Sequence, residues 1–445
     1  METSIGTAIG IAADVRAGRR SVREVVDACL ARIEAEDSGI GAFQVVAAEA
    51  ARREADVVAG RKDLADLPLA GVPVAIKDNV DVAGLPTRYG SAATDAELRR
   101  ADDLLVVRLR EAGAVVVGKT RLPELAIWGF TESKACGGTR SPRDPRRNAG
   151  GSTGGGAAAV ANGFVPLALG SDGGGSLRIP AANCGVVGFK PGPGVVPLAG
   201  GLAEHWFGCS AFGPVTATVA DAALALDVLA GTERWRDPVP PTRPLRVAVS
   251  LRSPSPIGPA DAESRRAVAA AADRMRAAGH TVVEADPRYS LTLANVWVQR
   301  WLAGVAMEVD QLGLDVRALE PRTRTMVAKG RRLLGRGRPR PADAERWRNR
   351  VLAWFDSFDV LVSPVIARPA PPAGWATDVG YLRAYLNGAR GVPYTQAWNV
   401  AGFPAMSLPM PGTPERPGAV QIVAPAGEEA TVLSLAVQLE AADAR

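Results

Sequence analysis

Apolar positions near the start of the chain recur at helical spacing. One helix face within SVREVVDACLARIEA collects Val22, Val25, Val26, Cys29, Leu30 and Ile33. Ser21 lies just before this face and is a candidate N-cap. Residues 16–60 are therefore predicted to be helical. The pattern changes to alternation in LAGVPVAIKDNVDVAG, where Val72, Val74 and Ile76 point one way, and this predicts a strand with Lys77 near its end.

Helical and strand patterns continue to alternate along the chain. Helices are expected at 102–114, at 150–163 after a glycine loop, at 219–231, at 260–280, over most of 290–358 and at 430–442. Strands are expected at 115–120, 164–170, 245–251, 281–286, 358–364 and 419–425. The order strand, helix, strand over 245–286 predicts a βαβ unit with parallel strands.

This alternation places the chain in the α/β class. The proline-rich, charged stretch TERWRDPVPPTRP at 232–244 could separate two domains, but strand patterns occur on both sides of it. We therefore favour a surface connection within one domain over 1–445. Its expected parts are N-terminal helices (1–70), a central core (71–232), a mostly helical region (233–358) and closing strands with a helix (359–445).

Composition narrows the class of protein. Of 445 residues, 47% are hydrophobic and 22% are charged, which is typical of a globular, soluble chain. No signal peptide or membrane span is expected, and a cytoplasmic location is the prediction. The net charge is +5. Basic residues gather at 329–341, where a solvated helical face is favoured over a nucleic-acid surface because no aromatic residues are interleaved.

Cysteine and histidine content limits the chemistry. The cysteines (Cys29, Cys136, Cys184 and Cys209) have no CxxC spacing and predict reduced thiols packed in the fold. The only histidines are His205 and His280. A protein-built transition-metal site is therefore not expected. A catalytic base must be one of these histidines or a lysine whose pKa is lowered by burial, for which Lys77 is well placed.

Two glycine-rich stretches suggest nucleophilic catalysis. GGSTGGG at 150–156 fits neither a phosphate loop nor, convincingly, a dinucleotide fingerprint. GSDGGGSLRIPA at 170–181 places three glycines before Ser176. Successive glycine N–H groups can turn toward a carbonyl oxygen and stabilise the charge that develops on it when a serine attacks. Arg178 follows where a GxSxG elbow needs glycine, so the α/β-hydrolase arrangement is excluded.

The same segments resemble the amidase signature family over nearly the whole chain. GVPVAIKDNVDVAGLPTRYGS is similar to the family's lysine segment, and GKTRLPELA to its GKT stretch. RSPRDPRRNAGGSTGGGAAAVANGFVPLALGSDGGGSLRIPAANCGVVGFKP resembles its central motif. QAWNVAGFPAMSLPMP and AVQIVAPAGEEATVLSLAVQLE are similar to its C-terminal segments. The resemblance implies one α/β/α sandwich around a large twisted mixed sheet.

The resemblance also implies roles for individual residues. Ser176 would be the nucleophile that forms an acyl-enzyme. Ser152 would follow a cis peptide bond and relay its proton, and Lys77 would be the base. The N–H groups of Gly173, Gly174, Gly175 and Ser176 would form the oxyanion hole. Two positions depart from the family's motif. Thr153 replaces its second serine, and Gly173 replaces its usual threonine.

Other residues near the motifs have less specific expectations. Asp172 and Arg178 flank the nucleophile and are expected to form a structural ion pair. The acyl pocket is expected from 127–134, 200–210 and the helical region after 290. Aromatic residues that are mostly core candidates, of which one or more would line this pocket, are Trp128, Phe130, Trp206, Phe207, Trp301 and Trp398.

The implied function is hydrolysis of a carboxylic amide without a metal or organic cofactor. The expected partner is a small-molecule amide, with no nucleic acid or membrane, and a homodimer stays open. One alternative is the glutaminase A-subunit of a tRNA-dependent amidotransferase, and another is a catalytically inactive homologue. The intact Lys77, Ser152 and Ser176 argue against the inactive form. The identity of the amide is not determined by these motifs.

Overall fold

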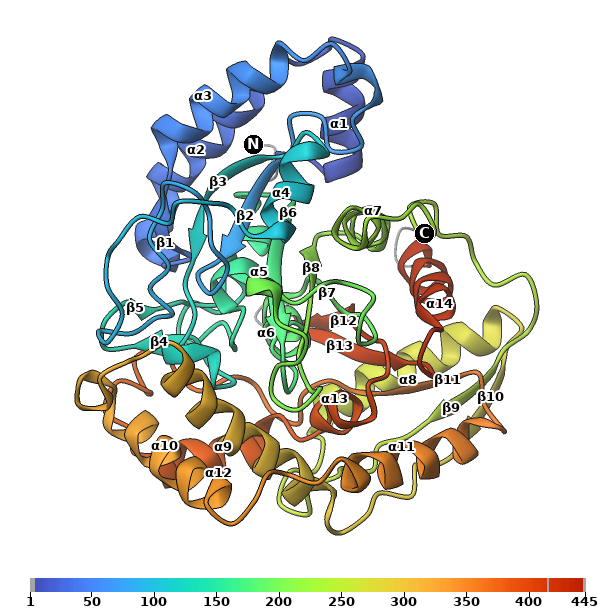
Figure 1. Ribbon diagram of the computed structural model, residues 1–445. Helices are drawn as coiled ribbons and strands as arrows, with labels where there is room; N and C mark the ends of the chain where they lie inside the picture. Colours follow the sequence, from blue (N-terminus) through green and yellow to red (C-terminus); the bar gives the residue numbers. More distant parts are fainter. Residues whose placement is uncertain (1–4, 414–415, 443–445) are drawn as a thin grey trace.

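One large mixed sheet runs through the protein (Figure 1). The structure is a computed structural model that describes residues 5–413 and 416–442. The described residues give it eleven strands. From edge to edge these are β1 (Phe43–Val46), β3 (Val115–Thr120), β2 (Pro73–Lys77), β6 (Leu167–Asp172), β8 (Ala211–Thr216), β7 (Val187–Lys190), β12 (Ala405–Thr413), β13 (Arg416–Val423), β11 (Val360–Pro364), β9 (Arg246–Val249) and β10 (Thr281–Glu284). A separate hairpin pairs β4 (Glu132–Ser133) with β5 (Gly137–Gly138).

Strand directions make the sheet mixed. β2 pairs in parallel with both β3 and β6, and β9 pairs in parallel with β10 and β11. The remaining pairs, including β6 with β8 and β12 with β13, are antiparallel. The predicted βαβ unit over 245–286 is confirmed by the parallel β9–β10 pair with helix α8 between its strands. The large mixed sheet with flanking helices confirms the predicted fold class.

Helices surround the sheet (Figure 1). Those described are α1 (Ala8–Arg16), α2 (Val22–Ile40), α3 (Ala48–Ala59), α4 (Leu104–Glu111), α5 (Gly154–Ala161), α6 (Arg178–Cys184), α7 (Val219–Ala230), α8 (Ala262–Ala277), α9 (Leu293–Gln311), α10 (Pro321–Leu334), α11 (Pro341–Phe355), α12 (Tyr381–Gly391), α13 (Gln396–Ala401) and α14 (Glu429–Ala441). Short 3-10 turns occupy Leu64–Asp66, Glu124–Ala126, Ala199–Gly201 and Val316–Ala318. None of the helices in the described ranges is long and apolar enough to cross a membrane.

The helix predicted after Ser21 is confirmed as α2. The Ser21 hydroxyl accepts from the Glu24 N–H at 3.1 Å, and the Glu24 carboxylate accepts from the Ser21 N–H at 2.8 Å. These reciprocal bonds form a capping box, which satisfies N–H groups that the first turn of a helix leaves without partners. The apolar face predicted for this helix is buried, from Val22 to Ile33.

Several strands were not predicted from the sequence. The prediction that residues 16–60 are purely helical is wrong, because β1 lies between α2 and α3 at the sheet edge. β7, β8 and β12 carry glycine or proline, which are depleted in strands. The strand predicted before Lys77 is confirmed as β2, and all five of its residues are buried. Strands covered on both faces lose the alternating signal.

A second, aromatic core lies away from the main core. It joins α9, α10, α11 and α13 to the loop around Trp128, and includes Trp301, Trp347 and Trp398. In Figure 1 the helices α9, α10 and α12 cluster at the lower left, below the part of the sheet that carries β2 and β6. This cluster provides much of the wall of the cavity described below.

Candidate active site

Lys77 ends β2 in a fully buried position. Its Nζ donates to Ser152 Oγ at 2.8 Å and to Ser171 Oγ at 2.9 Å. Ser171 lies near the end of β6, which pairs in parallel with β2. Parallel strands place their carboxyl ends at one edge of a sheet, where ligand sites of α/β folds commonly form. The sheet topology therefore brings the lysine and the two serines together.

Burial sets the protonation of this lysine. Removal from water lowers the pKa of Lys77 to about 7, against the opposing attraction of the Asp172 and Glu308 carboxylates. A charged ammonium group is poorly solvated in a buried site, so the neutral amine is favoured. Neutral Lys77 can accept a proton near neutral pH, which an ordinary lysine cannot do.

Ser152 follows a cis peptide bond from Gly151. It lies two residues before α5 and contacts Lys77 through its hydroxyl. The next residue, Thr153, donates its N–H to the Ser176 carbonyl at 3.1 Å and its hydroxyl to the Ser171 carbonyl at 3.2 Å. Thr153 thus links the two serine-bearing segments through both its backbone and its hydroxyl.

The glycine run before Ser176 is held from several sides. Trp297 Nε1 donates to the Gly173 carbonyl at 3.0 Å, and Thr395 Oγ1 donates to the Gly174 carbonyl at 2.6 Å. Gly175 has φ +121°, and a side chain there would collide with Thr395. Both observations require glycine at this position. Ser176 itself is half-buried and lines the cavity.

One of the expected oxyanion donors is already engaged. The Gly175 N–H donates to Asp172 Oδ1 at 2.6 Å within the loop. The expectation that Gly175 offers its N–H to a substrate is therefore not supported by this geometry. Backbone groups of Gly174 and Ser176 remain beside the cavity, which both residues line.

The departure at Gly173 has a steric reason. A Cβ at this position would lie 2.6 Å from Trp206 Cε3 and 3.1 Å from Ser210 Oγ. Trp206 therefore occupies the space that a larger residue at 173 would need. Its indole Nε1 donates to Glu308 on α9 at 3.2 Å, which fixes the ring in this place. The missing side chain at 173 is thus compensated by a tryptophan that lines the cavity.

Asp172 and Arg178 form a fully buried ion pair, as expected from the sequence. Arg178 Nε lies 2.9 Å from Asp172 Oδ2, and both side chains are completely buried. Burial alone would raise the pKa of Asp172, but the charge and hydrogen bonds of Arg178, with the charge of Lys190, hold it well below its usual range. Arg178 also donates to Asn399 Oδ1 at 2.7 Å. The pair therefore ties the glycine run to α13.

Removing one partner of this pair should be strongly destabilising. Arg178→Met leaves the Asp172 carboxylate buried without its main counter-charge, so we expect the free energy of unfolding to fall by about 3–5 kcal/mol. Urea unfolding measures the change. The control is Arg19→Met, which removes a surface pair with Asp14 whose side chains are 62% and 36% exposed and should lower stability by less than about 1 kcal/mol. Equal effects of the two variants would contradict a structural role for the buried pair.

Neither histidine contacts the predicted triad. His205 Nδ1 lies 2.7 Å from Ser210 Oγ, and its Nε2 lies 3.5 Å from Glu308. His280 Nδ1 accepts from the Leu245 N–H at 3.0 Å, far from the glycine run in the sheet. The four cysteines are buried and free. Of the alternatives left open by the sequence, only the lysine lies beside a serine of the motifs.

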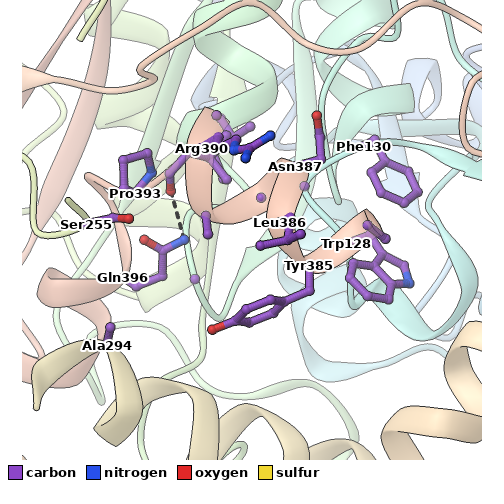
Figure 2. Close-up of a pocket in the computed structure, with 18 of the residues that line it drawn as sticks. Trp128, Phe130, Ser255, Ala294, Tyr385, Leu386, Asn387, Arg390, Pro393 and Gln396 are labelled. Carbon is purple, nitrogen blue, oxygen red and sulfur yellow. Dashed lines mark hydrogen bonds between the residues drawn. The ribbon is translucent and has the colours of Figure 1, made fainter. Parts of the chain in front are cut away.

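A cavity of about 550 Å³ opens beside Ser176. Its aromatic lining includes Trp128, Phe130, Trp206, Trp297, Trp301, Trp375 and Tyr385. Trp128 stacks on Phe130 with ring centroids 5.7 Å apart, and Trp297 stacks on Trp301 at 5.0 Å. Figure 2 shows Trp128 and Phe130 on one side, with Tyr385 and Leu386 extending from α12. Of the aromatics considered from the sequence, Trp398 and Phe207 are not part of this lining.

Sequence patterns missed much of the cavity wall. The segments 254–257, 368–371, 383–393 and 396–397 contribute, besides the expected regions near Trp128, Trp206 and α9. Ser171 and Asn79 were also missed as part of the lysine's surroundings, where Asn79 Nδ2 donates to Ser171 Oγ at 3.3 Å. The sequence did contain a signal for both residues. Asn79 lies in the KDN stretch that was considered for Lys77, and Ser171 lies in the GSDGGGS stretch that was considered for Ser176.

Comparisons with known proteins show similarity along most of the chain. The family model described as Amidase matches residues 24–433. AmiB2 of Mycobacterium tuberculosis, a protein named as an amidase, is 40% identical over 94% of this chain and 92% of its own length. An acylamidase of Rhodococcus erythropolis is 32% identical over 98% of this chain and 95% of its own length.

A solved structure shares both fold and sequence. The structure of a 6-aminohexanoate cyclic dimer hydrolase complexed with substrate has a TM-score of 0.86 and 30% identity, covering 98% of this chain and 97% of that one. The match to the family model spans most of the sequence, and the relatives are similar nearly end to end. The chain therefore belongs to the amidase signature family of amide-hydrolysing enzymes.

Proposed function

We propose that the protein hydrolyses a carboxylic amide through an acyl-enzyme on Ser176. The observation that carries this proposal is the buried hydrogen bond from Lys77 Nζ to Ser152 Oγ, next to a cavity lined by Ser176. A lysine with a pKa near 7, a hydroxyl in contact with it and a second serine facing a cavity make up a base, a relay and a nucleophile. The names of the relatives support hydrolysis over the amidotransferase alternative.

Acylation follows from these positions. Ser176 Oγ attacks the amide carbonyl carbon while Ser152 takes its proton and passes its own hydroxyl proton to neutral Lys77. The tetrahedral intermediate collapses as the C–N bond breaks, and the proton returns through Ser152 to the leaving nitrogen, so ammonia or an amine departs. Lys77 is neutral again after this step.

Deacylation uses the same groups. Water attacks the acyl carbonyl and gives its proton to the relay, and the acid leaves as Ser176 Oγ recovers a proton. In both steps the negative charge on the carbonyl oxygen is stabilised by backbone N–H groups of Gly174 and Ser176, with Gly173 beside them. One such donor is worth about 3–4 kcal/mol of transition-state stabilisation.

Acyl transfer to hydroxylamine tests the proposed function. Amides that release ammonia or aniline in a screen should also yield the corresponding hydroxamate when hydroxylamine is present, because it competes with water for the acyl-enzyme. Total amide consumption should stay constant where deacylation is not limiting. Release of the acid with no hydroxamate at any hydroxylamine concentration would contradict an acyl-enzyme.

The pH dependence of kcat/KM should report Lys77. Below about pH 7 the amine becomes protonated and cannot accept a proton, so kcat/KM should fall about tenfold per pH unit toward acid and level off above pH 7. Steady-state rates between pH 5 and 9 check this. The matched control is Lys190→Met, because burial also lowers the pKa of Lys190 to about 7. The fall in kcat/KM toward acid pH should persist in Lys190→Met. Its disappearance in that variant would show that Lys190, and not Lys77, is the group that titrates.

A further inference from the structure

Three arginines surround the cavity that holds Ser176. Arg368 follows β11, and Arg383 and Arg390 lie on α12; all three line the cavity and are exposed. Of the described residues that line it, none is aspartate or glutamate. The cavity therefore combines an aromatic interior with positively charged groups on its solvent side.

Among the described residues, these arginines have no carboxylate partner, unlike several other arginines. Within the described residues none of the three forms an ion pair, whereas Arg331 and Arg346 pair with Asp310 and Asp343. The guanidinium carbon of Arg383 lies 5.9 Å from the centroid of the Trp375 ring, in a cation–π contact. The nearest acidic residue before α12 is Asp378, and Lys134 pairs with it at 2.9 Å. No side chain of the described cavity wall thus offsets this charge.

The positions of the arginines let them act together. Arg383 and Arg390 are seven residues apart on α12, and this spacing places both side chains on one helix face. Asn387 lies between them at helical spacing, adds an amide and also lines the cavity. Arg368 approaches from a separate segment. Guanidinium groups from two segments can bind one carboxylate through several charge-assisted hydrogen bonds.

The interior is unsuited to a charge but suited to an apolar body. Trp206 and Trp297 both adjoin the glycine run, where Trp297 Cζ2 lies 2.5 Å from the position of a Cβ at Gly174. An ion placed among these rings would lose its hydration, so an anion is expected at the arginines and an apolar group beside the nucleophile.

We propose that the substrates are amides with an apolar or aromatic body and a carboxylate remote from the scissile bond. The body binds against Trp128, Trp297 and Trp301, and the carboxylate binds Arg383 and Arg390 with Arg368. This inference rests on the proposed function, because it places the amide carbonyl at Ser176. It adds a substrate class that the amide chemistry alone does not specify.

Matched substrate pairs test the inference. A neutral aryl amide that the enzyme hydrolyses is compared with its analogue carrying a remote carboxylate, placed on the leaving aniline in one pair and on the acyl part in the other. The wild-type ratio of kcat/KM, charged over neutral, should exceed about tenfold in one pair at low salt. It should decline as salt is raised from 20 to 500 mM. The pair that shows the effect identifies the end of the substrate that faces the arginines.

Charge-removing variants localise the effect. Arg390→Ala should lower the charged-over-neutral ratio about fivefold, and Arg383→Ala with Arg390→Ala should bring it close to one. The control is Arg332→Ala, which removes an exposed arginine of α10 outside the cavity lining and should leave the ratio unchanged. A wild-type ratio of one or less in both pairs, or an equal drop in the control, overturns the inference. The proposed function survives that outcome as long as hydrolysis of the neutral amide still requires Ser176.

Discussion

Ser176→Ala should lower kcat by about 10⁵-fold on any amide that the enzyme hydrolyses. Without the hydroxyl no acyl-enzyme can form, and only binding and backbone stabilisation of the carbonyl oxygen remain. The small side-chain change faces a cavity, so the fold should persist with a similar unfolding temperature. Single-turnover and steady-state rates with a chromogenic anilide measure the loss.

Another serine of the same cavity provides the control for this variant. Ser255 lines the wall in the segment 254–257. Ser255→Ala should keep kcat within about threefold of the wild type, because this hydroxyl belongs to none of the groups proposed to transfer a proton or attack the carbonyl. If Ser176→Ala turns over substrate at a rate close to that of the wild type, Ser176 is not the nucleophile and the proposed acyl-enzyme is contradicted.

Lys77→Met should lower kcat/KM by about 10³- to 10⁴-fold while the protein stays folded. Methionine has nearly the length of lysine and needs no hydrogen-bond partner in the buried site. The variant cannot accept the proton that Ser152 relays, and the acid limb of the pH profile should vanish with the group that titrates. Rates across pH and thermal unfolding together separate lost chemistry from lost structure.

Lys190→Met is the matched control for this loss. Lys190 is also a fully buried lysine, but its Nζ donates to the Pro191 carbonyl at 2.9 Å and it does not line the cavity. The two variants should have comparable stability, with activity retained only in Lys190→Met. If both lose activity equally, the loss reflects a damaged core and the assignment of Lys77 as the base has no support.

How much could be predicted from the sequence depended on whether a feature is local. The lysine at a strand end and the serine after a glycine run are local patterns, so Lys77 and Ser176 could be named from the residues themselves. Ser152 was named only through the resemblance to the amidase signature family. The α/β class followed from alternating patterns. By contrast, β1 has only four residues and lies at the sheet edge, where neither length nor burial produces a clear signal.

Features that depend on distant contacts could not be predicted. Thr395 and Asn399 reach the glycine run from more than 200 positions away in the chain, and no spacing rule links them to it. The engagement of the Gly175 N–H by Asp172 required the loop conformation to be known. Trp206 explains the glycine at 173 only because tertiary packing places the ring there. The lining from α12 depended in the same way on how the helices pack.

The most direct test is peptide mapping of enzyme quenched with acid during turnover of a slow ester or anilide. Tandem mass spectrometry distinguishes Ser176 from Ser152 and Ser171, which lie in nearby segments. The account predicts the acyl mass on Ser176 in the wild type and its absence in Ser176→Ala. An acyl group on another residue, or none under conditions where hydroxamate forms, would contradict the assignment of Ser176 as the nucleophile.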